Sequence, residues 1–250
     1  MEQRGFCTAN RGHFAYLLEM DLGQLTPEEF DAHIQGGTFR LSFVGMSNVG
    51  KSYRARVLRD ECDFMWYHVD GEIRKTLVFD TMDGISKWLG LPDTPGYKAR
   101  EQTYLNAEDK HTKVDFLETG GKNLVFDTTG SVIYLPQSTL SWLRENCLIV
   151  NIDAGEGSIV QMMEQFLLEP KPLIWQDYFQ VRAGESEKET LERCYPKLLS
   201  DRLLKYRALA HITIPVSELH NKSGKETLQV IQGYLKNADR PVSLLEKQAY

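Results

Sequence analysis

One eight-residue segment, Gly45 to Ser52, constrains the fold of this 250-residue chain more than any other feature. It reads Gly-Met-Ser-Asn-Val-Gly-Lys-Ser and matches the pattern G-x-x-x-x-G-K-[ST]. An apolar run (39–44) precedes it and a helix-compatible run (53–58) follows, so the expected order is strand, loop, helix. The two glycines allow the loop to curl and direct successive N–H groups at phosphate oxygens, with the positive end of the helix dipole behind them. The segment predicts a P-loop that binds nucleotide phosphates.

Individual positions of this loop have expected roles. The Lys51 amine is placed to reach the β- and γ-phosphates, and the Ser52 hydroxyl to bind Mg²⁺. ATP and Mg²⁺ are therefore the expected cofactors. The residues expected to surround the nucleotide phosphates are Gly45, Asn48, Val49, Gly50, Lys51, Ser52 and Tyr53.

Composition excludes several other classes of function. Hydrophobic residues make up 42% and charged residues 26% of the chain, as in ordinary globular proteins. The net charge is −6 and no dense stripe of Lys and Arg occurs, so a nucleic-acid partner is not expected. The four cysteines are scattered without metal-binding spacing, which favours reduced thiols and a cytoplasmic location. No apolar run is long enough to span a membrane, and no membrane partner is expected.

The rest of the chain alternates short apolar runs with helical patterns. Strands are expected at 39–44, 64–69, 123–127, 147–152 and 211–216. This alternation predicts an α/β fold in which helices cover both faces of a parallel sheet. Ligands of such sheets bind beyond the carboxyl ends of the strands. The P-loop, Asp70 and Asp127 all follow strands, so we expect them to meet at one edge.

The domain organisation follows from these elements. Residues 1–38 form an N-terminal extension with a helix start at Thr26, which is followed by Pro27 and Glu29. The main domain is expected at 39–236, with a mainly helical segment at 72–122 and a polar segment at 169–190. Residues 237–250 are a tail.

Five segments in order resemble the shikimate kinase family, a branch of the small P-loop kinases related to nucleoside monophosphate kinases. The resemblance runs from about Arg40 to Leu235 and rests on these segments: Phe43 to Ser52, Asp70-Gly71-Glu72-Ile73, Phe126 to Val132, Lys171-Pro172-Leu173-Ile174, and Arg202 with Tyr206 and Ala210. It implies a three-layer α/β/α P-loop NTPase fold with a central five-stranded parallel sheet. It also implies ATP-dependent phosphoryl transfer to a hydroxyl of a small hydroxy acid. The main domain, 39–236, would then be a P-loop kinase domain, with 72–122 as its helical substrate-binding insert and 169–190 as its lid. Asp70 would then be catalytic beside Lys51, and Asp70, Gly130, Lys171 and Arg202 would bind the substrate.

Five positions depart from the family pattern. The first Asp of the family's D-x-D segment is His68 here, and two of the three glycines of its triplet are Thr128 and Thr129. Leu105 and Lys171 stand where the family has substrate-binding arginines, so only Arg202 remains as arginine. Lysine replaces a bidentate arginine poorly at a carboxylate. The departures concern the substrate more than the nucleotide.

Several side chains have two interpretations. Asp127 ends an apolar strand and either anchors Mg²⁺ or caps the following turn. Asp70 either accepts a hydrogen bond from the substrate hydroxyl or caps a helix that begins at Gly71. His68, on the same strand face as Asp70, either touches phosphate or metal or is packed and hydrogen-bonded.

Further alternatives concern Arg202 and the lid. Arg202 contacts an acceptor carboxylate or the transferred phosphoryl group, or it is a surface ion-pair residue. Arg182 is the cation that we expect the closing lid to bring over the phosphates. Trp175, Tyr178 and Phe179 either shield the closed site or pack against neighbouring helices. Trp66 and Trp142 are assigned to the core.

Three classes of function follow from the sequence. The leading hypothesis is an ATP-dependent kinase of a small-molecule substrate, shikimate or another sugar acid or polyol such as gluconate. The alternative is a nucleotide-binding pseudokinase with a regulatory or scaffolding role, to which the changes at His68 and Leu105 point. A GTP switch is disfavoured because Asn221-Lys222-Ser223-Gly224 lacks the Asp of a guanine-reading N-K-x-D segment.

Overall fold

The computed structural model describes residues 25–114, 117–169 and 171–236, so the expected tail and most of the N-terminal extension lie outside the described residues. A five-stranded sheet in the order β2-β3-β1-β4-β5 forms its centre, and every neighbouring pair of strands is parallel. The strands are β1 (Arg40–Val44), β2 (Met65–His68), β3 (Leu124–Asp127), β4 (Leu148–Asp153) and β5 (Ile212–Pro215). The predicted parallel sheet is confirmed.

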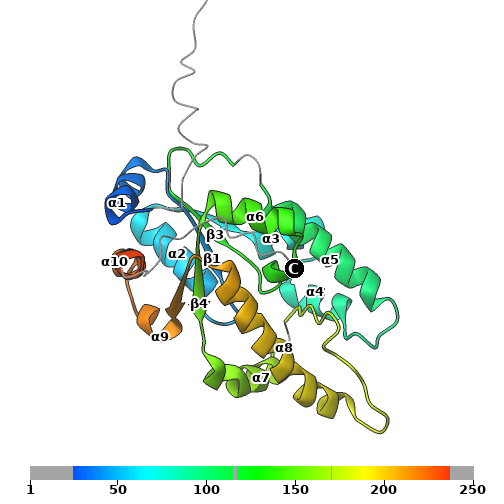
Figure 1. Ribbon diagram of the computed structural model, residues 1–250. Helices are drawn as coiled ribbons and strands as arrows, with labels where there is room; N and C mark the ends of the chain where they lie inside the picture. The colour runs from blue at the N-terminus through cyan, green and yellow to red at the C-terminus, as the bar shows by residue number, and fades with distance from the viewer. Residues whose placement is uncertain (1–24, 115–116, 170, 237–250) are drawn as a thin grey trace, which may run out of the picture.

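Helices cover both faces of the sheet and complete the predicted three-layer α/β/α fold (Figure 1). One layer contains α2 (Lys51–Cys62) and α10 (Gly224–Lys236), and the other contains α6 (Gln137–Asn146) and α8 (Glu187–Leu209). The sheet between them is apolar on both sides, because side chains of β1 and β4 such as Leu41, Phe43 and Ile149 are fully buried. None of the described helices has the length and apolar character needed to cross a membrane.

The helix α1 (Pro27–Gly36) packs against α10 and begins as predicted. The Thr26 side chain accepts a hydrogen bond from the Glu29 backbone, and the Glu29 side chain accepts one from the Thr26 backbone. Gly37 ends the helix with φ 65°, a left-handed conformation that favours glycine. Phe30 anchors the helix, since its ring lies 4.8 Å from that of Phe39 at the start of the sheet.

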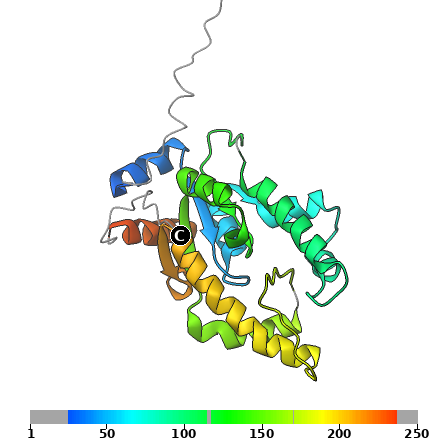
Figure 2. The same ribbon diagram turned by 45° about the vertical axis from the view of Figure 1, so that its right-hand side comes forward.

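The insert between β2 and β3 is helical, as the sequence predicts. Its helices are α3 (Val69–Thr76), α4 (Met82–Leu89) and α5 (Tyr97–Thr112). Figures 1 and 2 show them grouped at one side of the sheet, and α5 lies against α3 and α4. The break between α4 and α5 falls at Pro92, Pro95 and Gly96, where Gly96 has φ 79°.

Two helix boundaries differ from those expected. The helix α3 begins at Val69 rather than Gly71, so Asp70 lies within its first turn and is not its N-cap. Helix α8 begins at Glu187, inside the predicted lid 169–190, because Ser186 and Glu189 form a capping box. Val160 in α7 (Ile159–Leu168) is 62% exposed, because this helix lies at the periphery and contacts α8.

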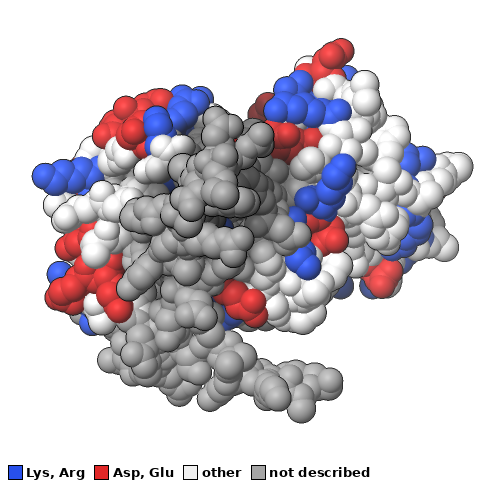
Figure 3. Space-filling view, turned by 90° about the horizontal axis from the view of Figure 1, so that it is seen from above, with Lys and Arg blue, Asp and Glu red and all other residues white. Residues whose placement is uncertain are grey.

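The remaining short elements connect the larger ones. They are the 3₁₀ turns η3 (Val132–Tyr134) and η4 (Glu156–Ser158) and the helical turn α9 (Val216–Leu219). On the face seen in Figure 3, acidic and basic side chains are interspersed outside the grey atoms.

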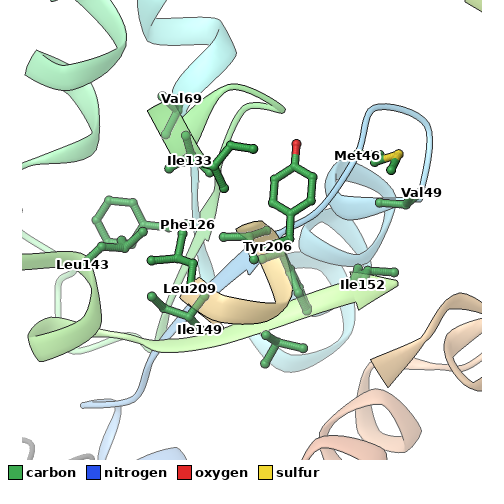
Figure 4. Close-up of a cluster of buried hydrophobic side chains, with 14 of the residues drawn as sticks. Met46, Val49, Val69, Phe126, Ile133, Leu143, Ile149, Ile152, Tyr206 and Leu209 are labelled. Carbon is green, nitrogen blue, oxygen red and sulfur yellow. The ribbon is translucent and has the colours of Figure 1, made fainter. Parts of the chain in front are cut away.

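The core extends to the loop that follows β1. Figure 4 shows Met46 and Val49 on this loop beside Ile152 of β4, with Tyr206 of α8 nearby. Met46 is 2% and Val49 5% exposed. The apolar side chains of the loop therefore hold it against the sheet and leave its backbone for other contacts.

Candidate functional site

Three strands end at one edge of the sheet and bring the predicted residues together. In the strand register, Asp127 of β3 pairs with Phe43 of β1 on one side and with His68 of β2 on the other. The loop at Gly45 follows two residues after Phe43, and Asp70 two residues after His68. The P-loop, Asp127 and Asp70 therefore meet at the carboxyl edge, as the sequence predicts.

The P-loop conformation depends on its first glycine. Gly45 has φ 138°, and a Cβ atom built there would lie 2.7 Å from the Ile152 carbonyl oxygen. Only glycine fits this position. Gly50 has φ 94° with open space around its Cβ position, and no described side chain caps the N-terminus of α2. The first N–H groups of α2 thus have no side-chain acceptor, which suits them to an anion.

Lys51 is braced against this loop. Its amine donates hydrogen bonds to the carbonyl oxygens of Gly45 and Met46, each at 2.8 Å, and the residue is 8% exposed. Burial lowers the pKa of Lys51, while the negative charges of Asp127 and Asp70 oppose that shift. The cation and two carboxylates therefore share one small volume at the sheet edge.

Asp127 is 2% exposed and is held by two residues of β2. Trp66 Nε1 donates a hydrogen bond of 3.3 Å to Asp127 Oδ2, and His68 Nε2 lies 3.6 Å from the same oxygen. The Trp66 and His68 rings lie 5.1 Å apart. His68 is therefore packed beside a carboxylate. Trp66 is only half-buried, contrary to its assignment as core, because its indole faces this edge; Trp142 is also half-buried, packed at 6.2 Å on Phe126.

Asp70 faces the helical insert. Its Oδ1 accepts a hydrogen bond of 3.3 Å from the Tyr104 hydroxyl of α5. Burial raises the pKa of Asp70, and the neighbouring His68 and Lys51 counteract this. A raised pKa brings a carboxylate closer to the range in which it can take a proton from an alcohol during reaction.

A cavity of about 520 Å³ opens beside the P-loop, between the insert and the loop that precedes α8. Its size matches sites for small molecules. Its polar lining comes from Ser47, Asp70, Asp83, Tyr104, Thr129, Gly130, Ser131, Glu169, Lys171 and Arg202. All four residues predicted to bind substrate line it: Asp70, Gly130, Lys171 and Arg202.

Glu108 lies behind the wall of this cavity and is fully buried. The Thr129 hydroxyl donates to one carboxylate oxygen, and the Ser131 hydroxyl donates to the other at 2.5 Å. Burial raises the pKa of Glu108 to about 7, even though both hydrogen bonds favour the ionised form. The sequence did not single out this residue.

Arg202 is 2% exposed and so is not a surface ion-pair residue. Its Nη1 donates to the Gly130 carbonyl at 3.1 Å, and its Nη2 to the Ile174 carbonyl at 2.6 Å. Its Nε donates to the Tyr134 hydroxyl at 3.3 Å. Arg202 therefore ties the turn after β3 to the loop before α8 at the cavity wall.

Gly130 is the remaining glycine of the altered triplet and approaches the P-loop closely. A Cβ atom there would lie 3.3 Å from Ser47 Oγ. Its carbonyl also accepts a hydrogen bond from the Tyr206 hydroxyl. The threonine beside it has a structural role, since Thr128 Oγ1 donates to the Phe43 carbonyl at 2.7 Å.

The loop of residues 171–186, part of the predicted lid, lines the cavity with Lys171, Pro172 and Ile174 and is anchored to neighbouring elements. Tyr97 Oη accepts a hydrogen bond of 3.1 Å from the Trp175 backbone, and Glu101 Oε1 accepts one of 3.0 Å from the Gln176 backbone. At the start of the loop, the Lys171 amine donates to Asn48 Oδ1 on the P-loop. The lid segment therefore touches both the insert and the P-loop.

The lid aromatic residues pack rather than face the cavity. Trp175 and Phe179 are buried, with rings 5.0 Å apart, and Trp175 also contacts Phe166 of α7 and Tyr195 of α8. Packing against neighbouring helices is thus confirmed for Trp175, while Phe179 packs on Trp175 and Tyr178 is half-buried. Arg182 is exposed and does not line the cavity, so its contact with phosphate stays a prediction.

The groups at this edge of the sheet are of the chemical types that bind ATP and Mg²⁺. An uncapped helix start and a glycine loop suit phosphate, and Ser52 and Asp127 offer the oxygen ligands that Mg²⁺ prefers. No group of three His, Cys, Asp or Glu residues that could hold a metal occurs among the described residues. A cation here would rely on Ser52, Asp127 and the phosphates together. The Tyr53 side chain is 50% exposed, and the Arg54 guanidinium lies 4.9 Å from the centre of its ring.

Comparison with solved structures finds shikimate kinases. That from Acinetobacter baumannii in complex with shikimate gives a TM-score of 0.51 at 21% identity, covering 84% of this chain and 99% of that one. That from Bacteroides thetaiotaomicron gives a TM-score of 0.51 at 14% identity, covering 79% and 98%. No family model and no curated protein matches the chain. The expected resemblance is confirmed at the level of the fold: the chain has the fold of shikimate kinases.

Proposed function

We propose that the protein is an ATP-dependent kinase that phosphorylates a hydroxyl group of a small molecule. The observation that carries this proposal is the juxtaposition of the P-loop, with Lys51 braced on it, and a 520 Å³ cavity that contains Asp70. A kinase needs these two sites to share one wall, because the phosphoryl group passes directly between them. The fold likeness to shikimate kinases supports the same reaction class.

Each residue has a role in the proposed reaction. The N–H groups at the start of α2 and the Lys51 amine would hold the phosphates, and Lys51 would neutralise charge that develops during transfer. Ser52 and Asp127 would hold Mg²⁺, which supplies further charge neutralisation when bound. Asp70 would orient the acceptor hydroxyl and accept its proton, and its raised pKa favours this step.

The surrounding elements would position the reactants. Tyr104 fixes Asp70 through its hydroxyl, and Trp66 fixes Asp127. Lys171 connects the lid to the P-loop. Closure of the lid over bound nucleotide would exclude water from the site. Arg182 is the candidate for a further phosphate contact after closure. The hydroxy acid expected from the resemblance would have to be recognised by Lys171 and Arg202.

ADP release with a panel of small alcohols and hydroxy acids tests the proposal. We expect acceptor-dependent release by the wild-type protein and a loss of about 10²-fold or more in Lys51→Met. Asp70→Asn should retain ATP binding and lose about 10²- to 10⁴-fold in kcat. Lys225→Met is the matched control, because Lys225 is exposed on α10 and does not line the cavity.

The outcomes separate the two classes of function. Turnover that is equal in wild type and Lys51→Met would contradict the proposed site. Tight ATP binding without turnover of any acceptor would favour the pseudokinase with a regulatory role.

A further inference from the structure

The cations of the acceptor cavity are already engaged. Among the described residues that line it, two are basic, Lys171 and Arg202. Each nitrogen of Arg202 donates to an uncharged oxygen of the protein, and the guanidinium also lies 5.2 Å from the centre of the Tyr134 ring. The Lys171 amine donates to the P-loop residue Asn48. Neither cation presents the free two-nitrogen fork that binds a carboxylate well.

Of the four hydroxyl side chains that line the cavity, Ser47, Tyr104, Thr129 and Ser131, the last three donate their protons away from it. Thr129 and Ser131 line it, yet both donate their protons to the buried carboxylate of Glu108. A hydroxyl has a single proton to donate, so these two side chains offer the cavity only lone pairs. The same is true of Tyr104, whose proton goes to Asp70.

The charge of the wall is also unfavourable to an anion. Asp70, Asp83 and Glu169 line the cavity, and Glu108 lies directly behind it. Asp83 is partly neutralised by Lys87 at 2.7 Å, but Asp70 and Glu108 have no ion-pair partner within 4.0 Å among the described residues. A bound carboxylate would therefore face like charges, which disfavours its binding.

We infer that the acceptor is a polyhydroxylated molecule without a carboxylate. This inference rests on the proposed kinase function. Its hydroxyl groups would donate to Asp70 and to the hydroxyl oxygens of Ser131 and Thr129, of which Thr129 Oγ1 also accepts a hydrogen bond of 3.0 Å from the Ser131 backbone. Met82, Ile174 and Pro172 of the same lining would contact its carbon skeleton. The specificity-determining residue is Glu108, because it holds the two wall hydroxyls as acceptors and adds negative charge behind them.

Matched pairs of acceptors test this inference. The pairs are myo-inositol with quinate, glucitol with gluconate, and glycerol with glycerate, with shikimate added as a further acid. The readouts are kcat/KM for ADP release at pH 8 and, for every compound, binding to the protein loaded with Mg²⁺-ADP by isothermal titration calorimetry. In at least one pair, we expect kcat/KM or the binding affinity to be about tenfold or more higher for the alcohol than for its acid. This ratio is a preference of about 1.4 kcal/mol.

A substitution of Glu108, behind the cavity wall, tests whether this residue causes the preference for alcohols over acids. Glu108→Gln removes the buried charge and supplies an amide that can donate, so the alcohol-to-acid ratio should fall by about fivefold at pH 8. Glu145→Gln makes the same change at an exposed position of α6 and should leave the ratio unaltered. The affinity for Mg²⁺-ATP should be the same in all three proteins.

Two results would overturn the inference. One is an acid that binds or reacts better than its alcohol partner in every pair; the other is a panel in which no carboxylate-free compound binds or reacts. In either case, intact Mg²⁺-ATP binding that depends on Lys51 shows that only the acceptor class is wrong. Loss of that binding in the wild-type protein would instead refute the proposed function.

Discussion

At the scale of the residue, Glu108 is the most unusual group in the molecule. It is fully buried with a pKa raised to about 7 by burial, from an ordinary value of 4.5. Asp70 adds to this shift through its negative charge, while Thr129, Ser131 and Arg202 oppose it. Ionising a carboxyl group in such a place costs free energy, so the Glu108 carboxylate does not itself stabilise the fold.

Glu108 makes stability depend on pH in a defined direction. The folded chain binds this proton more tightly than the unfolded chain, so the contribution is complete below pH about 4.5 and is lost as the pH rises through about 7. The shift corresponds to about 3 kcal/mol. Urea unfolding of wild type and Glu108→Gln should show the free-energy difference, wild type minus variant, falling by about that amount from pH 5 to pH 8. Parallel curves would contradict a raised pKa.

At the scale of the element, α5 connects the acceptor cavity to the lid. Its buried face carries Tyr97, Glu101, Tyr104 and Glu108. The first two hold the lid backbone at Trp175 and Gln176, and the last two reach Asp70 and the cavity wall. One rigid helix thus touches both the acceptor site and the segment that would close over it.

Tyr97→Phe tests the anchor of the lid. The variant leaves the buried N–H of Trp175 without its acceptor, which should cost about 1–3 kcal/mol of stability. Hydrogen exchange should accelerate at the backbone of residues 173–179 and remain unchanged in the sheet. Tyr234→Phe, which removes a surface hydrogen bond to Glu218 on the far side, is the control. Equal protection of the lid in Tyr97→Phe and wild type would argue against the anchor.

At the scale of the whole molecule, the strands and the loop that follows β1 could be predicted because their signals are local. The P-loop is a contiguous pattern, and apolar runs that end in Asp127 or precede Asp70 mark strand ends. The lateral order β2-β3-β1-β4-β5 is not encoded in any segment, because it depends on contacts between strands distant in sequence.

The site residues that the sequence did not reveal escaped notice for a physical reason. The buried face of α5 alternates tyrosine and glutamate at positions 97, 101, 104 and 108, so in sequence it looks like a solvated face rather than a packed one. The spacing of i, i+4, i+7 and i+11 was a usable signal. Trp66 and His68 were likewise recognisable as one face of a strand, but their shared contact with Asp127 required the register of β2 on β3.

Calorimetric titration of Mg²⁺-ATP into the wild-type chain and Lys51→Met is the most direct test of nucleotide binding at the carboxyl edge of the sheet. We expect saturable binding by the wild type and a loss of at least about tenfold in affinity in the variant, since Lys51 is the buried cation of the loop. The proposed site would be contradicted if the wild-type chain showed no heat of binding at millimolar Mg²⁺-ATP. Equal affinity of the wild type and Lys51→Met would contradict it as well.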